Sequence, residues 1–184
     1  MKPVFAVLAL LATSAFVTPA FADESLLTAE QLAAKFLAQQ ATRGLVIAPS
    51  SGEAAATDGT ALPEDTTYVA LDPSSQVNFE IKFAFDSAAL EATEVAKLDT
   101  LCEVVKTSEI AQFQIIGHTD ASGSDSYNQN LSLLRAEEVK RHMVENCGVP
   151  DAKLVATGVG EAFPMDPNDP RADVNRRVEF QVGS

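Results

Sequence analysis

Residues 112–120 read QFQIIGHTD, and residues 126–146 read SYNQNLSLLRAEEVKRHMVEN. The first stretch is rich in β-branched and aromatic residues and predicts a strand from Gln112 to Thr119. The second stretch repeats apolar side chains at helical spacing and predicts a helix, which Gly148 and Pro150 terminate. A strand that leads through a short loop into a long helix is therefore the central unit of this chain, and Asp120 lies where the strand ends.

Further strands and helices are predicted on both sides of this unit. Residues 77–85 alternate apolar and polar side chains, which predicts a half-buried strand. Asp86 or Ser87 can cap the helix that follows. Lys153–Thr157 predicts a third strand and Val174–Val182 a last one. This order, βαβαββ, predicts an α/β fold with parallel pairing in each strand-helix-strand unit and both helices on one face of the sheet.

The first 22 residues read as an export signal. Lys2 supplies a positive charge, Val4–Val17 supplies an apolar run, and Ala20-Phe21-Ala22 resembles a cleavage site. The apolar run is short for a membrane span of ~20 residues, so retention as an uncleaved anchor is the lesser alternative. We expect an exported chain with a signal peptide at residues 1–22.

Residues 23–75 differ in composition from the rest of the chain. A capping-box pattern at Thr28 opens a predicted short helix, Ala29–Thr42, with Leu32, Phe36 and Leu37 on one face. A segment rich in small and polar residues follows and predicts a linker. The folded domain is predicted at residues 76–184.

The chain is acidic, with 13 Lys and Arg against 26 Asp and Glu and a formal net charge of -13. The predicted signal contains one Lys and no acidic residue, so the remainder carries 12 - 26 = -14. Nucleic-acid phosphates and anionic lipids both favour basic surfaces. The charge therefore argues against nucleic acid and against electrostatic docking on a membrane.

Cys102 and Cys147 are the two cysteines of the chain. In an exported protein such a pair favours a disulfide. The alternative is two buried thiols that act as small apolar side chains.

Arg135 stands on an apolar stripe of the predicted central helix. Leu131, Val139 and Met143 share this stripe at intervals of four residues. A partly buried cation needs a partner, and Asp120 at the end of the preceding strand is the nearest candidate. The pair is either a structural ion pair or a site for a zwitterionic ligand.

The arginines near the C-terminus are unusual in so acidic a chain. If residues 174–182 alternate as a strand, Arg177 points outward and could simply be solvated. Arg176 then lies on the core side with Val178 and requires a partner, as Arg135 does. A second core-side arginine favours an anion-binding site.

Catalysis and metal binding have little support in the sequence. His118 and Asp120 share a strand face by alternation, but His142, the other histidine, has no second His or Cys at ligand spacing. The serines of residues 122–126 lack the strand-to-helix elbow of a hydrolase nucleophile. The sequence predicts no enzyme, no metal and no cofactor.

Several linked motifs resemble the OmpA-like, peptidoglycan-associating domain of Gram-negative envelopes. They are FDSA with a following Leu90 at residues 85–90, GHTD at 117–120, YNxxLSxxRA at 127–136, GxGExxP at 158–164 and NRRV at 175–178. The resemblance covers about residues 76–182 and implies an α/β two-layer sandwich with a mixed sheet. One departure is the pair Asp173-Val174, where the family more often has a single residue before Asn175.

The resemblance also implies a ligand, the meso-diaminopimelate of the peptidoglycan stem peptide. Asp120 would accept its ammonium group and Arg135 would bind its carboxylate as a bidentate fork. Asn128, Ser122 and Arg176 would complete the pocket, with the backbone near Ala88 donating to the carboxylate. The implied location is the periplasm, with a possible association with the outer membrane.

Two other functions remain open at this point. The chain could be an envelope scaffold that recruits a protein partner through Leu32, Phe36 and Leu37, although a packed or frayed terminus is the simpler interpretation of that helix. A wall-cleaving enzyme is disfavoured because the sequence offers neither a nucleophile nor metal ligands.

Overall fold

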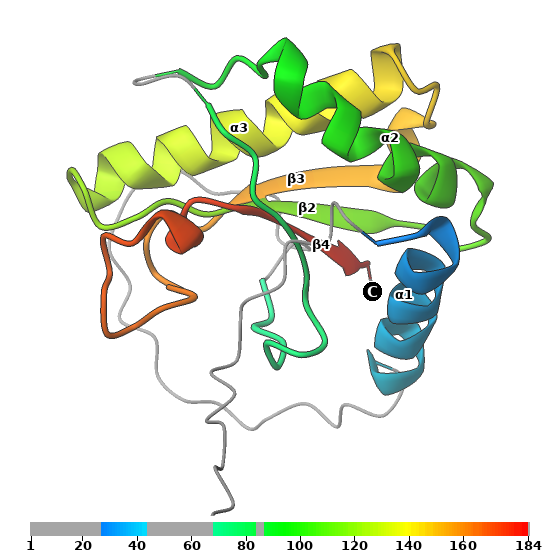
Figure 1. Ribbon diagram of the computed structural model, residues 1–184, viewed down its shortest axis with the longest axis horizontal. Helices are drawn as coiled ribbons and strands as arrows, with labels where there is room; N and C mark the ends of the chain where they lie inside the picture. Colours follow the sequence, from blue (N-terminus) through cyan, green and yellow to red (C-terminus); the bar gives the residue numbers. More distant parts are fainter. Residues whose placement is uncertain (1–26, 44–67, 84–86, 184) are drawn as a thin grey trace, which may run out of the picture.

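The computed structural model describes residues 27–43, 68–83 and 87–183, and it forms one mixed α/β unit (Figure 1). The predicted signal peptide and most of the predicted linker lie outside these described residues. The elements are α1 (Ala29–Arg43), β1 (Val77–Phe79), α2 (Ala92–Thr107), β2 (Phe113–Gly117), α3 (Asp125–Glu145), η2 (Asp151–Lys153), β3 (Leu154–Gly158), η3 (Asp173–Asn175) and β4 (Val178–Val182).

The strands form one sheet in the order β1-β4-β2-β3. β2 and β3 pair in parallel, as the second strand-helix-strand unit predicts. β4 pairs antiparallel with both β1 and β2, so it separates the two strands that were expected to pair in the first unit. The expected pairing of β1 with β2 is therefore wrong. The physical reason is that β4 is buried along its whole length, and a central position gives hydrogen-bond partners to both of its edges.

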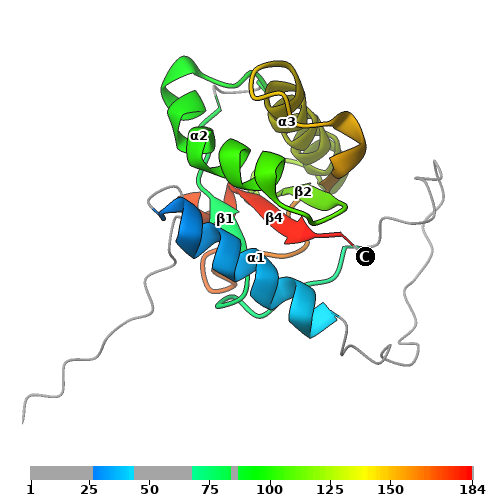
Figure 2. The ribbon, with the colours of Figure 1, turned by 90° about the vertical axis from the view of Figure 1, so that its right-hand side faces the viewer.

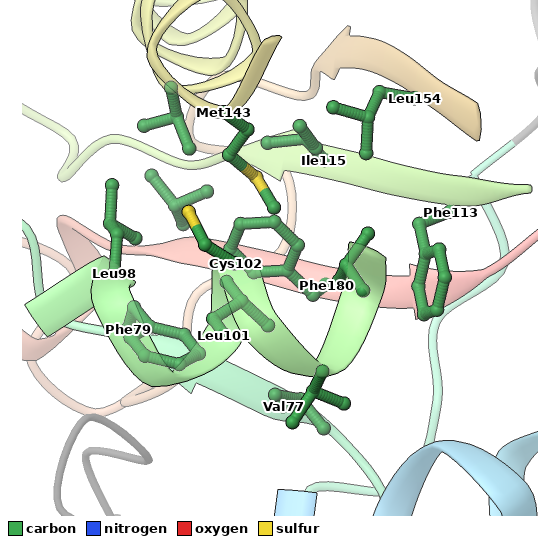
Figure 3. Close-up of a cluster of buried hydrophobic side chains, with 14 of the residues drawn as sticks. Val77, Phe79, Leu98, Leu101, Cys102, Phe113, Ile115, Met143, Leu154 and Phe180 are labelled. Carbon is green, nitrogen blue, oxygen red and sulfur yellow. The ribbon is translucent and has the colours of Figure 1, made fainter. Parts of the chain in front are cut away.

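Helices α2 and α3 cover one face of this sheet, as predicted (Figure 1). The core lies between the two layers, where Phe79 and Phe180 meet edge to face with ring centroids 5.6 Å apart. Figure 3 shows this core, which includes Val77, Phe79, Leu98, Leu101, Cys102, Phe113, Ile115, Met143, Leu154 and Phe180. The α/β two-layer sandwich is confirmed.

Two glycines allow α3 to lie directly on the sheet. Gly117 of β2 and Gly158 of β3 are partners in the parallel register. A Cβ atom on Gly117 would lie 2.0 Å from the carbonyl oxygen of Ser132, and one on Gly158 would lie 2.4 Å from the amide nitrogen of Leu133. Only glycine permits this approach, which places the middle of α3, with Arg135, close to the ends of the strands.

The first predicted strand is shorter than expected. β1 ends at Phe79, and among the described residues that follow, Phe83 and Leu90 form an isolated antiparallel bridge. Residues 84 and 85 of the predicted strand lie outside the described residues. The Glu94 carboxylate accepts from the amide of Lys82 at 3.1 Å, so a side chain replaces the missing ladder partner. The bridge also delays the next helix, which begins at Ala92 rather than near residue 87.

The second face of the sheet is polar and nevertheless buried. Glu179 and Gln181 are fully buried there. The segment of residues 68–76 covers them, since Tyr68 donates to Glu179 at 3.1 Å and Gln181 donates to the carbonyl of Val69 at 3.0 Å. Tyr68 also packs against Phe163 from the loop after β3. Hydrogen-bonded loops thus take the place of water on this face.

Helix α1 is part of the same folded unit. It matches the predicted Ala29–Thr42 closely, and Thr28 and Gln31 form the expected capping box at 2.9 and 3.3 Å. Figure 2 shows α1 beside β1 and β4, on the side away from α3. Leu32 and Phe36 are fully buried, and the Phe36 ring lies 5.0 Å from Phe113. The interpretation of this helix as a packed terminus therefore describes it correctly.

Cys102 of α2 and Cys147, just after α3, form the predicted disulfide, with a Cα–Cα distance of 5.8 Å. This bridge joins the two helices that cover the sheet. In the described part of the chain, no helix is long and apolar enough to cross a membrane.

Candidate ligand-binding site

A cavity of about 320 Å³ lies beside the chain segment that leaves β1. Side chains from this segment, from α3 and from η3 line it: Glu80, Ile81, Lys82, Phe83, Arg135, Asp173 and Arg176. The lining combines cationic and anionic groups with an aromatic ring. Such a lining suits a small ligand that carries charges of both signs.

Asp120 follows β2 and belongs to this site through Arg176. Its Oδ2 accepts from Arg176 Nη1 at 2.7 Å, and its Oδ1 accepts from the amide of Ser122 at 2.8 Å. Burial alone would raise the pKa of Asp120, but the hydrogen bonds from Arg176 and Ser122 outweigh it and hold the pKa below its ordinary value. The carboxylate is therefore ionised at neutral pH.

Arg135 lies on α3 with only 8% of its surface exposed. Its Nε donates to the carbonyl of Ser87 at 3.3 Å, and its guanidinium stacks 4.8 Å from the ring centroid of Phe83. Burial lowers its pKa from the ordinary value. Within residues 27–43, 68–83 and 87–183, no carboxylate lies within 4.0 Å of it. The structural ion pair between Asp120 and Arg135 is therefore wrong, because Asp120 pairs with Arg176 instead. The alternative, a ligand site that uses both residues, stays a prediction.

Arg176 binds two carboxylates at the mouth of the cavity. Its Nη1 meets Asp120 at 2.7 Å and its Nη2 meets Asp173 at 2.6 Å. The hydrogen bond with Asp120 raises the pKa of Arg176. The side chain is 40% exposed, so it is not the core-side cation that alternation predicted. It lies before the first residue of β4, where the alternation of the strand no longer decides burial.

The remaining predicted residues lie around Asp120 and Arg135. Asn128, at the start of α3, is 1% exposed and donates to the carbonyl of Asp120 at 3.2 Å and to the Glu161 carboxylate. Ser122 is exposed and orients Asp120 through its amide. Ala88 is half-buried and directly follows Ser87, whose carbonyl receives the Arg135 hydrogen bond. The predicted residues are thus brought together, although the contacts among them differ from those expected.

Phe83, Asp173 and Glu161 were not predicted as parts of the site. Phe83 supplies the ring under Arg135, Asp173 pairs with Arg176, and Glu161 accepts from Asn128. The extra residue at Asp173-Val174 was a usable signal for Asp173, since it lies directly before the Asn175-Arg176 motif.

The environment predicted for Arg177 is also wrong. It was expected to be solvated, but it is 5% exposed on the second face of the sheet, where it donates to Asn78 Oδ1 at 3.1 Å. The Glu179 carboxylate lies 4.0 Å from it and is hydrogen-bonded to His118 Nε2 at 3.1 Å. His118 therefore does not share the environment of Asp120, because regular β2 ends at Gly117 and alternation stops there.

Comparisons with known proteins identify the family to which this fold belongs. The family model described as the OmpA family matches residues 82–177, just over half of the chain. Outer membrane porin F of Pseudomonas fluorescens is 35% identical over 109 residues, which are 58% of this chain and 33% of the porin. Outer membrane protein A of Serratia marcescens is 36% identical over 105 residues, which are 56% of this chain and 29% of that protein. The chain spans about a third of the length of these curated relatives.

Solved structures show the same fold. The OmpA-like domain of FopA1 from Francisella tularensis superimposes with a TM-score of 0.50 at 25% identity, covering 59% of this chain and 73% of that one. The cell wall anchor of the T6SS from Pseudomonas aeruginosa gives a TM-score of 0.50 at 26% identity, covering 62% and 87%. The segment matched by the family model contains α2, β2, α3 and β3 together with Asp120 and Arg135, and β1 and β4 lie just outside it. The chain therefore belongs to the OmpA family.

Proposed function

We propose that this chain is a non-catalytic peptidoglycan-binding protein of the periplasm that recognises the diaminopimelate of the stem peptide and tethers the cell wall to the envelope. The observation that carries the proposal is the environment of Arg135. This nearly buried guanidinium donates to a carbonyl oxygen and stacks on an aromatic ring. A carboxylate from a ligand would supply the bidentate partner that such a group favours.

Asp120 is positioned to bind the other charge of the ligand. An ionised carboxylate has about four acceptor sites, and Asp120 uses some of them for hydrogen bonds from Ser122 to Oδ1 and from Arg176 to Oδ2. An ammonium group can therefore join without displacing either donor. Asn128 would hold Asp120 in place by donating to its backbone carbonyl, at the ammonium end of the ligand. The backbone near Ala88 would donate to the carboxylate at the other end.

The relatives support a role at the wall. One of the similar solved structures is named as the cell wall anchor of a secretion system, and the curated relatives are named as outer membrane proteins. A periplasmic or outer-membrane-associated location for this chain agrees with its sequence. The excess of acidic residues argues against nucleic acid as a partner.

A second candidate function is an envelope scaffold that binds a protein partner through α1. A groove of about 630 Å³ lies between α1 and the end of α2, with Leu37 60% exposed at its edge. Leu32 and Phe36 are fully buried, although Phe36 lines this groove, so Leu37 is the exposed member of the recruiting face proposed from the sequence. In-cell cross-linking tests this role, since a Leu37→Asp variant should lose a protein adduct that Asp120→Asn retains.

Co-sedimentation with diaminopimelate-type sacculi tests the leading proposal. Asp120→Asn and Arg135→Gln each remove one charged contact worth about 1.5–3 kcal/mol, so each should weaken binding roughly 10- to 100-fold. Asp99→Asn and Arg141→Gln are matched controls, because Asp99 is exposed on α2 and Arg141 pairs with Glu138 and Glu145 on the outer side of α3. Both controls should sediment like the unmodified chain. Equal sedimentation of all variants would refute the proposal.

A further inference from the structure

Three metal-binding side chains converge where α2 and α3 meet. They are Cys102 of α2, His142 in the last turn of α3 and Cys147 just after it. One ligand atom from each lies within 4.8 Å of the others. Cys102 is 4% exposed and His142 8% exposed, whereas Cys147 is only half-buried. His142 and Cys147 have four residues between them, which is within the spacing of metal-ligand pairs. Cys102 comes from a different helix, so sequence spacing did not reveal the third ligand.

The geometry fits a tetrahedral metal site when the sulfurs are not bonded to each other. Zinc binds sulfur at about 2.3 Å and histidine nitrogen at about 2.0–2.1 Å, which places neighbouring ligand atoms roughly 3.3–3.8 Å apart. The three ligand atoms of this cluster lie within 4.8 Å of one another. The two sulfur atoms must separate, by rotation of the Cys102 side chain on α2 and of the Cys147 side chain just after α3.

The dithiol state that such a site needs exists in every newly made chain. Cysteines are incorporated as thiols, and the disulfide forms only later in an oxidising compartment. Metal binding and disulfide formation then compete for the same two sulfur atoms.

We propose that the dithiol form of this chain binds a divalent cation of the zinc class through Cys102, His142 and Cys147. The cation replaces two thiol protons, which are released to solvent, and water fills the fourth position on the open side near Cys147. The metal would join α2 to α3 as the disulfide does. This site is separate from the cavity around Arg135 and does not depend on peptidoglycan binding.

Cobalt(II) is the probe of choice, because thiolate coordination gives it an intense charge-transfer band and tetrahedral geometry gives it visible ligand-field bands. The chain is first reduced anaerobically with a phosphine. In this reaction the disulfide takes up two electrons and two protons, and the phosphine is oxidised to the phosphine oxide with an oxygen atom from water. After removal of the phosphine, one cobalt per chain should give both bands, and zinc should abolish them. The oxidised chain should give neither.

The variants His142→Ala and Cys102→Ser identify the ligands. His142→Ala should weaken zinc binding roughly tenfold or more, measured by competition with a chromophoric chelator, and Cys102→Ser should abolish the charge-transfer band. Circular dichroism of oxidised His142→Ala checks that the fold is intact, and slower alkylation of the thiols in the presence of zinc gives an independent readout. A reduced chain without cobalt bands, or a His142→Ala variant that binds zinc as the unmodified chain does, would overturn the proposal.

Discussion

Arg135 and Arg177 are both nearly buried guanidinium groups, but their surroundings differ. Arg177 is held by Asn78, by the carbonyl of Phe163 and by Glu179 nearby. Arg135 has the Ser87 carbonyl and the Phe83 ring. Because a buried charge without a counter-charge is costly, Arg177 is stabilised by its own fold, whereas Arg135 gains most from an added anion.

The alternating sequence of the last strand correctly predicted which side chains share a face of the sheet. It wrongly predicted that the polar side chains on one face are exposed to water. Glu179 and Gln181 do lie on the face opposite Val178 and Phe180, with Arg177 beside them. The period of a strand distinguishes its two faces, but it does not reveal that Tyr68 and Phe163 from distant loops cover the polar one. The polar side chains of this face were therefore expected to be hydrated, whereas protein groups supply their hydrogen bonds.

His118 on this buried face should make stability sensitive to mild acid. Burial lowers its pKa from about 6.5 to about 4, with the Glu179 hydrogen bond acting in the opposite direction and Arg177 adding to the lowering. Above pH 6.5 the ring is neutral in both the folded and the unfolded chain. Between pH 6.5 and 5 the unfolded chain takes up a proton that the folded chain does not, so the free energy of unfolding should fall by up to about 1.4 kcal/mol per pH unit.

Urea unfolding of the unmodified chain and of His118→Gln over this pH range measures the effect. The side-chain amide introduced by this substitution can still donate to Glu179 but cannot titrate, so the variant should show a flatter dependence, whatever its stability at pH 7. An equal slope for both chains would rule out His118 as the source.

At the scale of elements, helices α1 and α3 were predicted more accurately than α2 and the first strand. α1 and α3 begin and end within a residue of their expected bounds, since capping residues and helical periodicity mark both. The strand expected over residues 77–85 is regular only to Phe79. Its alternation continues in the sequence, but β4 ends the pairing there, and the Glu94 carboxylate binds the chain at Lys82.

Gln39 joins α1 to the sheet and should contribute measurably to stability. It is 2% exposed, its Oε1 accepts from the amide of Val182 at 3.0 Å, and its Nε2 donates to the carbonyl of Ser75 at 2.8 Å. Gln39→Ala would leave the buried amide of Val182 without its partner, so we expect a loss of about 1–3 kcal/mol in the free energy of unfolding.

The neighbouring Gln40 is exposed and provides a matched control. Gln40→Ala should change the urea midpoint by no more than the equivalent of about 0.5 kcal/mol. If the two substitutions have equal effects, α1 is not anchored through Gln39.

At the scale of the whole molecule, the folded unit extends beyond the family match. The match begins at residue 82, yet α1 supplies Leu32 and Phe36 to the same core as β4 and α2. The amphipathic pattern of residues 29–42 predicted a helix but could not show which surface it would cover, because helical periodicity carries no information about a distant partner. The assignment of α1 to the core therefore required the structure.

Removal of the Phe36 ring tests this integration. Phe36→Ala should lower the free energy of unfolding by about 3–5 kcal/mol, since it leaves a cavity against Phe113. Leu37→Ala is the control, because that side chain is 60% exposed and its loss should cost less than about 0.5 kcal/mol. A single denaturation transition in both variants, with only Phe36→Ala shifted, would confirm one cooperative unit, and a Phe36→Ala variant as stable as the unmodified chain would contradict it.

The most direct test of the proposed function is calorimetric titration with two soluble stem peptides, one with meso-diaminopimelate and one with lysine in its place. The two peptides share the side-chain ammonium group and differ by the carboxylate assigned to Arg135. We expect the diaminopimelate peptide to bind at least roughly tenfold more tightly, from one charged hydrogen-bonded contact. In Arg135→Gln this difference should disappear, while Arg141→Gln should retain it. Equal affinities of the unmodified chain for both peptides would contradict the assignment of Arg135 as the carboxylate-binding residue.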